Sequence, residues 1–215
     1  TILGVDGLSV WEVGTVMNIT THNVMNHPVG NFPTSDNANT IEDKSYSYTI
    51  ESFVGRVDPS SLGTNYANAT STSNTAIGLA TNGALITNAN SGIAHSDSTN
   101  FTYNNMFRNE VSRDTTGGAP DNNGIYGYIQ PSPQAVGLDN WNTTAHSPIV
   151  GWAFDGFPIY GPYGYSDRAN ASSSIKRIES SYSLKTTARS TIGGLPTGEF
   201  VEDYEYNSST GDLDA

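Results

Sequence analysis

One run constrains the architecture of this chain more than any other: His146-Ser-Pro-Ile-Val-Gly-Trp-Ala-Phe-Asp-Gly-Phe-Pro-Ile-Tyr-Gly-Pro-Tyr-Gly-Tyr-Ser-Asp167. It holds four glycines, three prolines, one tryptophan and five phenylalanine or tyrosine residues, with Asp155 as the single acid in its interior. Each proline fixes φ and removes a backbone donor, so the run cannot continue as one helix or one strand. Glycines supply the dihedral angles that sharp turns need. The run therefore predicts a short buried strand over residues 149–154, a turn at Asp155-Gly156 and an aromatic loop packed against the core.

Apolar and polar residues alternate in several other segments, which is typical of half-buried strands. Residues 8–19 are rich in β-branched side chains, and residues 46–50 and 200–206 alternate regularly. Residues 76–86 place apolar runs on both sides of Asn82-Gly83, a strong hairpin signal because both turn residues tolerate positive φ. These patterns predict a mainly β fold. We expect a single β-rich domain over residues 1–215, with long irregular loops rich in Gly, Pro and Asn and with little helix.

The composition limits the classes of function. The chain has 215 residues, nine Lys and Arg against 21 Asp and Glu, and a formal charge of −12. Nucleic-acid partners need clustered cations, so none is expected. The chain has no cysteine, which excludes disulfides and thiolate chemistry. No apolar run approaches membrane-spanning length, so we expect no membrane insertion. The polar but weakly charged composition is typical of extracellular, cell-surface or virion proteins.

Several motifs follow one another in a recognisable order. They are His27-Pro-Val-Gly-Asn-Phe-Pro33, Ile77-Gly-Leu-Ala-Thr-Asn-Gly83, the aromatic run, and Phe200-Val-Glu-Asp-Tyr-Glu-Tyr206. Together they resemble the family of YHYH-domain proteins, named for a Tyr-His-Tyr-His element. The resemblance implies a fold and a setting in secreted or surface-associated bacterial proteins. A variant form resembles segments of structural proteins carried by tailed phages of marine bacteria. The resemblance implies no particular reaction.

The chain departs from the family pattern at the naming element, which falls at Tyr126-Gly127-Tyr128-Ile129. Two histidines at alternate strand positions face the same side and could share a metal or act as an acid–base pair. Gly127 and Ile129 can do neither. Tyr126 and Tyr128, on the other face, are expected to form a stacking surface. The family pattern also continues past the end of this chain, so we expect a segment of a longer polypeptide, truncated before its last strand.

Three residues are the catalytic candidates if the protein is an enzyme: Asp155, His27 and His146. Burial disfavours the charged form of a carboxylate, so an acid among aromatic residues is a candidate general base. An Asp before Gly is also an ordinary turn former that caps local amides. The two histidines stand close before prolines and could ligate a metal if the fold brings them together. Such a site would belong to a metal-dependent hydrolase or lyase acting on an extracellular polymer.

Aromatic and acidic residues supply the binding candidates. Tyrosine combines rigid area with a polar tip, which suits sugar stacking or protein docking. The candidate binding residues are Tyr126, Tyr128, Trp152, Tyr160 and Tyr163, with Tyr165 in the same patch; the same side chains could instead pack the loops. Asp212 and Asp214 are candidate calcium ligands, since Ca²⁺ prefers oxygen. The alternative is a solvated acidic edge that discourages strand aggregation.

Glu202 is expected to have a structural role and not a binding role. Strand alternation over residues 200–206 would put it on the same face as Phe200 and Tyr204. A carboxylate held on an apolar face needs a cation. We therefore expect Glu202 to pair with Arg168 or Arg189.

No catalytic constellation emerges from these motifs, and the two histidine positions of the naming element are replaced. The sequence therefore favours a non-enzymatic structural or adhesive β-domain of a virion or extracellular surface assembly. Its expected partners are other copies or other proteins of that assembly, and glycans. The metal-dependent hydrolase or lyase, and a calcium-stapled carbohydrate-binding module, are the alternatives.

Overall fold

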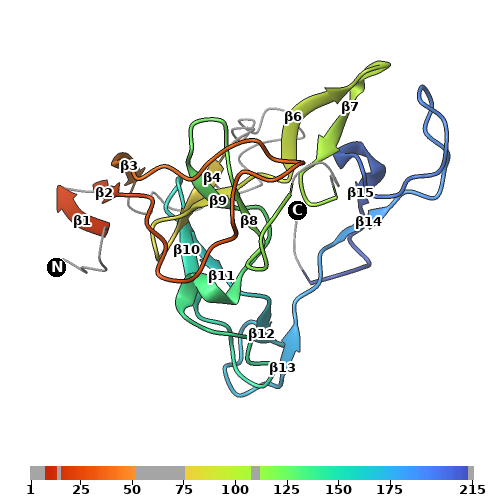
Figure 1. Cartoon of the computed structure of the whole chain (residues 1–215). Coiled ribbons are helices and arrows are strands. Elements are labelled where there is room, and N and C mark those ends of the chain that lie inside the picture. The colour runs from red at the N-terminus through yellow and green to blue at the C-terminus, as the bar shows by residue number, and fades with distance from the viewer. Residues whose placement is uncertain (1–7, 14–15, 52–75, 108–111, 213–215) are drawn as a thin grey trace.

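Short strands joined by long loops dominate the computed structural model, which describes residues 8–13, 16–51, 76–107 and 112–212. The prediction of a mainly β fold is confirmed (Figure 1). Among the described residues the longest helical element is a four-residue 3-10 turn, η3 (Pro133–Val136). No helix in this part of the chain is long and apolar enough to span a membrane.

A six-stranded mixed sheet forms the centre of the fold, in the order β11-β10-β4-β5-β9-β8. Its strands are β4 (Ala76–Ala80), β5 (Leu85–Thr87), β8 (Gly118–Pro120), β9 (Tyr126–Tyr128), β10 (Ile149–Ala153) and β11 (Pro158–Tyr160). Only β5 and β9 pair in parallel within this sheet. The aromatic run thus supplies one edge of the sheet, while β9 lies near the opposite edge.

Both predicted turns of this sheet are confirmed. The β4–β5 hairpin turns at Asn82-Gly83, where Gly83 has φ of 88°. The β10–β11 hairpin turns at Asp155-Gly156, where Gly156 has φ of 89°. Glycine adopts these left-handed angles without the steric cost that a β-carbon imposes.

A second, three-stranded sheet packs beside the first. It comprises β1 (Leu8–Val13), β2 (Val16–Thr21) and β3 (Tyr46–Glu51), in that order. Ile19 and Ile50 from this sheet join Leu79 of β4 in one buried cluster. Trp152 and Phe154 of the aromatic run pack against that cluster. Through these two side chains, the aromatic run anchors the central sheet to β2 and β3.

Three two-stranded ribbons complete the fold, in the pairs β6-β7, β12-β13 and β14-β15. Their bounds are β6 (Asn90–His95), β7 (Ser98–Asn104), β12 (Tyr163–Tyr165), β13 (Ile175–Arg177), β14 (Tyr182–Leu184) and β15 (Tyr204–Tyr206). Figure 1 shows the β12–β13 ribbon as a separate lobe below the central sheet. The other two ribbons lie together to one side of that sheet, joined where Tyr103 bridges Phe200.

A buried ion pair holds the β14–β15 ribbon in place. The Arg189 guanidinium donates from Nε and Nη2 to the two carboxylate oxygens of Asp203, at 2.7 and 2.8 Å. Backbone N–H groups of Thr197, Gly198 and Phe200 donate to the same carboxylate. The side chains of Arg189 and Asp203 are 9% and 0% exposed. This carboxylate is therefore fully enclosed and fully hydrogen-bonded.

The prediction that Glu202 pairs with a cation is wrong, because the next residue, Asp203, forms the ion pair with Arg189. Residues 201–203 form a 3-10 turn, η4 (Val201–Asp203), and the strand begins only at Tyr204. The turn rotates Asp203 inward to Arg189. Glu202 instead accepts a hydrogen bond from the backbone N–H of Thr102, at 2.7 Å.

Candidate functional site

The two tyrosines of β9 are interior residues. Tyr126 is 0% exposed and Tyr128 is 3% exposed, and their rings meet edge to face at 5.7 Å. Met25, Val29 and Ile41, from the long segment between β2 and β3, pack against their cluster. The expected stacking surface on this face of β9 is therefore not present, because that segment covers both rings.

The hydroxyl of Tyr126 has its hydrogen-bonding needs met inside the protein. It donates to Asp114 Oδ2 at 2.8 Å and lies 2.6 Å from Thr116 Oγ1. The Asp114 carboxylate also accepts from the backbone N–H groups of Gly30, Thr116 and Gly118. Burial alone would raise the pKa of Asp114, but these hydrogen bonds hold it below its ordinary value. Burial also raises the pKa of Tyr126, so its hydroxyl stays protonated.

Tyr128 is paired in a similar way, with His27. His27 Nδ1 lies 2.9 Å from the carbonyl oxygen of Pro28, which can only accept, so Nδ1 carries a hydrogen. In a neutral ring Nε2 is then an acceptor, and it takes the Tyr128 hydroxyl hydrogen at 2.5 Å. Asn82 Nδ2 donates to the same hydroxyl oxygen at 2.8 Å. Burial raises the pKa of Tyr128 to about 12, which keeps the hydroxyl a donor.

The three catalytic candidates lie in different surroundings. Asp155 is exposed in its turn, where Oδ1 accepts from the backbone N–H of Phe157 at 3.4 Å. His27 contacts the buried tyrosines, whereas His146 contacts Tyr160 in the aromatic run. No contact joins any two of the three in the described structure. Across the described ranges, no group of three or more histidines and carboxylates is placed to hold a metal ion.

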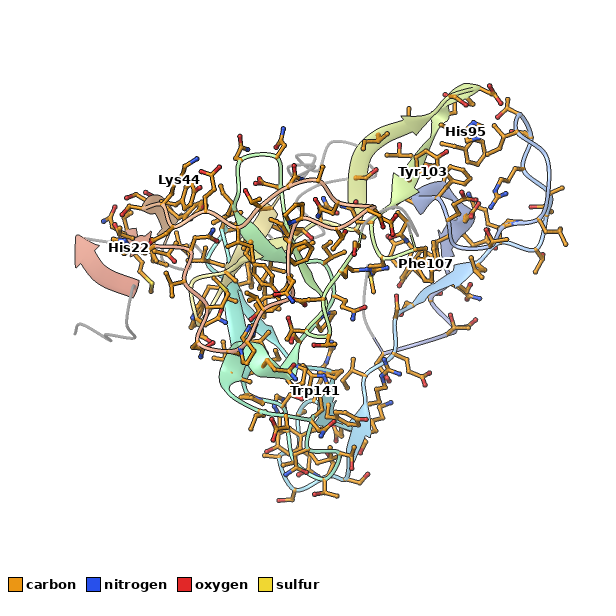
Figure 2. All side chains as sticks on the ribbon, in the orientation of Figure 1. His22, Lys44, His95, Tyr103, Phe107 and Trp141 are labelled. Atoms are coloured by element: carbon orange, nitrogen blue, oxygen red, sulfur yellow. The ribbon has the colours of Figure 1, made fainter. Side chains whose placement is uncertain are left out.

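The remaining histidines are also scattered. Figure 2 shows His22 beside the three-stranded sheet and His95 on the β6–β7 ribbon, at opposite sides of the molecule. His22 Nδ1 lies 3.0 Å from the hydroxyl of Ser45, and the His95 ring packs against Phe200 at 5.5 Å. Both therefore have local packing roles.

The two calcium candidates, Asp212 and Asp214, lie near the end of the chain. Asp212 pairs with Lys176, and its Oδ2 accepts from the backbone N–H of Glu179 at 3.1 Å. The bond from Lys176 holds the pKa of the Asp212 carboxyl below its usual range. Asp214 lies outside the described residues. The Asp212 carboxylate is thus engaged by a cation of the protein.

A cleft of about 840 Å³ opens on the β12–β13 lobe. Its side-chain lining comes chiefly from the aromatic run and from β13: His146, Tyr160, Tyr163, Tyr165, Arg168, Lys176 and Ile178. The His146 ring lies 5.2 Å from Tyr160, edge to face, and 5.0 Å from Tyr165. Of the predicted binding residues, Tyr160 and Tyr163 are brought together here, while Trp152 packs against the core instead.

The polar tips in this cleft differ from those of the buried tyrosines. His146 Nδ1 lies 2.8 Å from the carbonyl oxygen of Ser147 and so carries the hydrogen, which leaves Nε2 as an acceptor in the neutral ring. Neither this nitrogen nor the hydroxyls of Tyr160, Tyr163 and Tyr165 hydrogen-bonds to another described residue. Concave sites with a few converging polar groups on aromatic walls are typical of small-ligand and sugar binding.

Backbone contacts make the cleft wall firm. Ser147 N–H donates to the carbonyl oxygen of Tyr163 at 2.8 Å, and Tyr163 N–H donates to Ser147 Oγ at 3.0 Å. A β-carbon on Gly161 would stand 2.5 Å from Trp141 Cζ3, so the indole packs directly on this glycine. Figure 2 places Trp141 at the top of the same lobe. Nothing in the sequence around Trp141 signalled this support.

These features define a cysteine-free, mainly β protein with two hydrogen-bonded tyrosines in its core and an aromatic cleft. The model of the YHYH protein family matches residues 33–215, and the chain belongs to this family. No curated protein and no solved structure matches the chain.

Two hydrogen-bonded carboxylates, one buried and one half-buried, predict a loss of stability in acid. The pKa values of Asp114 and Asp203 are both lowered by hydrogen bonds in the folded state. The unfolded chain then takes up protons first as the pH falls, so their contribution is present above about pH 4 and is lost below it. Urea unfolding at pH 7 and pH 3 measures this loss. An Asp114→Asn variant should show a smaller difference between the two pH values; an equal difference would contradict the assignment.

Proposed function

We propose that this YHYH protein is a non-enzymatic structural or adhesive domain of an extracellular or virion surface assembly, and that it attaches through the cleft on the β12–β13 lobe. One observation carries the proposal. The hydroxyls of the buried tyrosines are all paired, whereas those of the cleft tyrosines and Nε2 of His146 have no partner among the described residues. Unpaired polar tips beside exposed aromatic rings are available to a ligand.

The non-enzymatic part of the proposal has separate support. Metal-dependent hydrolysis needs ligands gathered about 2 Å from one ion. Asp155, His27 and His146 share no contact in the described structure, and His27 is already bonded to Tyr128. The protonated, buried tyrosines have no route to act on a polymer outside.

The naming element of the family supports the same proposal. We align it with Tyr126-Gly127-Tyr128-Ile129, in which both histidine positions are replaced. A β-carbon on Gly127 would stand 3.1 Å from Thr87 Cγ2, so a larger side chain requires its neighbour to move. We propose that this chain is a variant that lost the histidine pair and kept the two tyrosines as core residues. We propose a virion setting because the order of its motifs resembles that in segments of marine phage structural proteins.

A Tyr160→Ala variant tests the proposal. Tyr160 is 48% exposed and lines the cleft, so its removal should leave stability unchanged. We expect binding to immobilised envelope fractions of marine bacteria to weaken by at least ~10-fold, as for an aromatic hot spot. Biolayer interferometry measures the change.

Tyr182→Ala is the matched control, because Tyr182 is 55% exposed and lies on β14, outside the cleft. It should bind like the unaltered protein. Equal binding by all three proteins, or no binding to any envelope fraction, would overturn the proposed role of the cleft.

A further inference from the structure

We infer that the ligand of the cleft is a carbohydrate carrying an anionic substituent, either a carboxylate or a sulfate ester. This inference rests on the proposed function and deepens it by assigning a chemical class. It depends on three observations: the aromatic walls with their open polar tips, the placement of the cations, and the ion pair at the rim.

The walls fit a sugar ring better than a peptide or a flat protein surface. Tyr160 and His146 present rings at 5.2 Å, edge to face, which gives an apolar face beside a polar edge. The C–H face of a pyranose packs on such rings, and its hydroxyls need donors and acceptors at the margin. The hydroxyls of Tyr163 and Tyr165 and the Nε2 atom of His146, which have no partner among the described residues, supply them.

Two cationic side chains line this cleft in an acidic protein. The chain has nine Lys and Arg residues against 21 Asp and Glu. Three of the nine, Arg168, Lys176 and Arg177, lie in the ten-residue segment 168–177 of the β12–β13 lobe. Arg168 and Lys176 line the cleft together with Asp212, and Arg177 lines a shallow hollow with Lys176, Glu179 and Asp212. A cation on the cleft wall favours an anionic sugar over a neutral one.

The strand register aims Lys176 into the cleft. Lys176 lies directly opposite Gly164 across the β12–β13 ribbon, so the two residues face the same side. A β-carbon on Gly164 would stand 3.1 Å from Cδ1 and Cγ1 of Ile178 and 3.8 Å from His146 Nε2, so the Ile178 side chain packs on this glycine. Lys176, Ile178 and His146 therefore border the same part of the cleft. An acidic substituent bound in this part of the cleft would meet the Lys176 ammonium group.

Lys176 is held at the cleft by an ion pair with Asp212, in which a ligand anion can replace the Asp212 carboxylate. Asp212 accepts its hydrogen bond and is itself fixed by the backbone N–H of Glu179. The Lys176 and Asp212 side chains are 41% and 23% exposed, and such surface pairs contribute little net stability. Asp212 therefore positions the ammonium group and competes with the ligand anion for it. Removing the Asp212 charge should strengthen binding.

Titration with polysaccharides tests this inference. The probes are polygalacturonate, which carries carboxylates, sulfated dextran, which carries sulfate esters, and neutral dextran, which carries no charge. Lys176→Met should weaken binding of the acidic probe by at least ~10-fold, the equivalent of one charge-assisted hydrogen bond. Asp212→Asn, which keeps the acceptor for Glu179 N–H, should raise affinity severalfold. Added salt should weaken binding by the unaltered protein.

Lys44→Met is the matched control, because Lys44 is exposed and lies on the far side of the molecule (Figure 2). It should bind like the unaltered protein. Binding confined to neutral dextran, or acidic binding that Lys176→Met leaves unchanged, would overturn the inference. So would envelope binding that is sensitive to Tyr160→Ala but is not inhibited by either acidic probe; that result would leave the proposed function intact, with a protein as ligand.

Discussion

The Asp203→Ala variant is expected to lose about 3–5 kcal/mol of unfolding free energy, the usual cost of removing one partner from a buried ion pair. The substitution leaves the Arg189 guanidinium, which is 9% exposed, without its counter-charge. It also removes the acceptor for the N–H groups of Thr197, Gly198 and Phe200. The β14–β15 ribbon should therefore be the first part of the described chain to open.

Urea unfolding at pH 7 measures this loss, and hydrogen exchange locates it. Asp212→Ala is the matched control, because it breaks an ion pair that is partly exposed at both ends and should change stability far less. A double variant, Asp203→Leu with Arg189→Met, should recover part of the loss, since no buried charge is left unpaired. Equal effects from Asp203→Ala and Asp212→Ala would show that the buried pair has no special role.

The Tyr126→Ala variant is expected to lose a similar amount, about 3–5 kcal/mol, because it empties the centre of the core beside β9. The ring is 0% exposed and packs among Tyr128, Ala80 and Ala135. The loss combines the transfer of an aromatic ring to water with an unfilled cavity. Tyr126→Phe keeps the ring and should lose only about 1–3 kcal/mol, since it removes one donor to the Asp114 carboxylate.

Chemical denaturation of both variants beside Tyr160→Ala checks this order. Tyr160 belongs to the same residue type but is exposed, so its loss should stay within about 0.5 kcal/mol. If Tyr126→Ala were as stable as Tyr160→Ala, the tyrosines of β9 would not be core residues. The claim that these two tyrosines take no part in ligand binding would then fail.

Local chemistry explains why much of the fold was predictable. The β4–β5 and β10–β11 turns follow from Asn82-Gly83 and Asp155-Gly156, whose glycines adopt positive φ. The strand over residues 200–206 was predicted less well, because the periodicity does not reveal the 3-10 turn at Val201–Asp203. That turn shifts the buried acid by one residue. A period-two pattern predicts the wrong face wherever a turn interrupts it.

Contacts between distant segments explain what the sequence could not predict about the site. Tyr126 is buried because Asn23, 103 residues away, bonds its backbone N–H and brings a covering segment with it. Tyr160 and Tyr163 were placed in a binding patch from their local aromatic context, and they do line the cleft. Lys176 has no such local signal, since its role depends on the register of β13 against β12.

One measurement tests most directly the claim that the interior polar groups are structural and the cleft is the site of attachment. A ¹⁵N NMR titration with the acidic polysaccharide fragment that binds best would locate the ligand. We expect chemical-shift changes at Tyr160, Gly164 and Lys176, and none at Tyr126 or Tyr128. Changes centred on β9 and His27, with the β12–β13 lobe unaffected, would contradict this account.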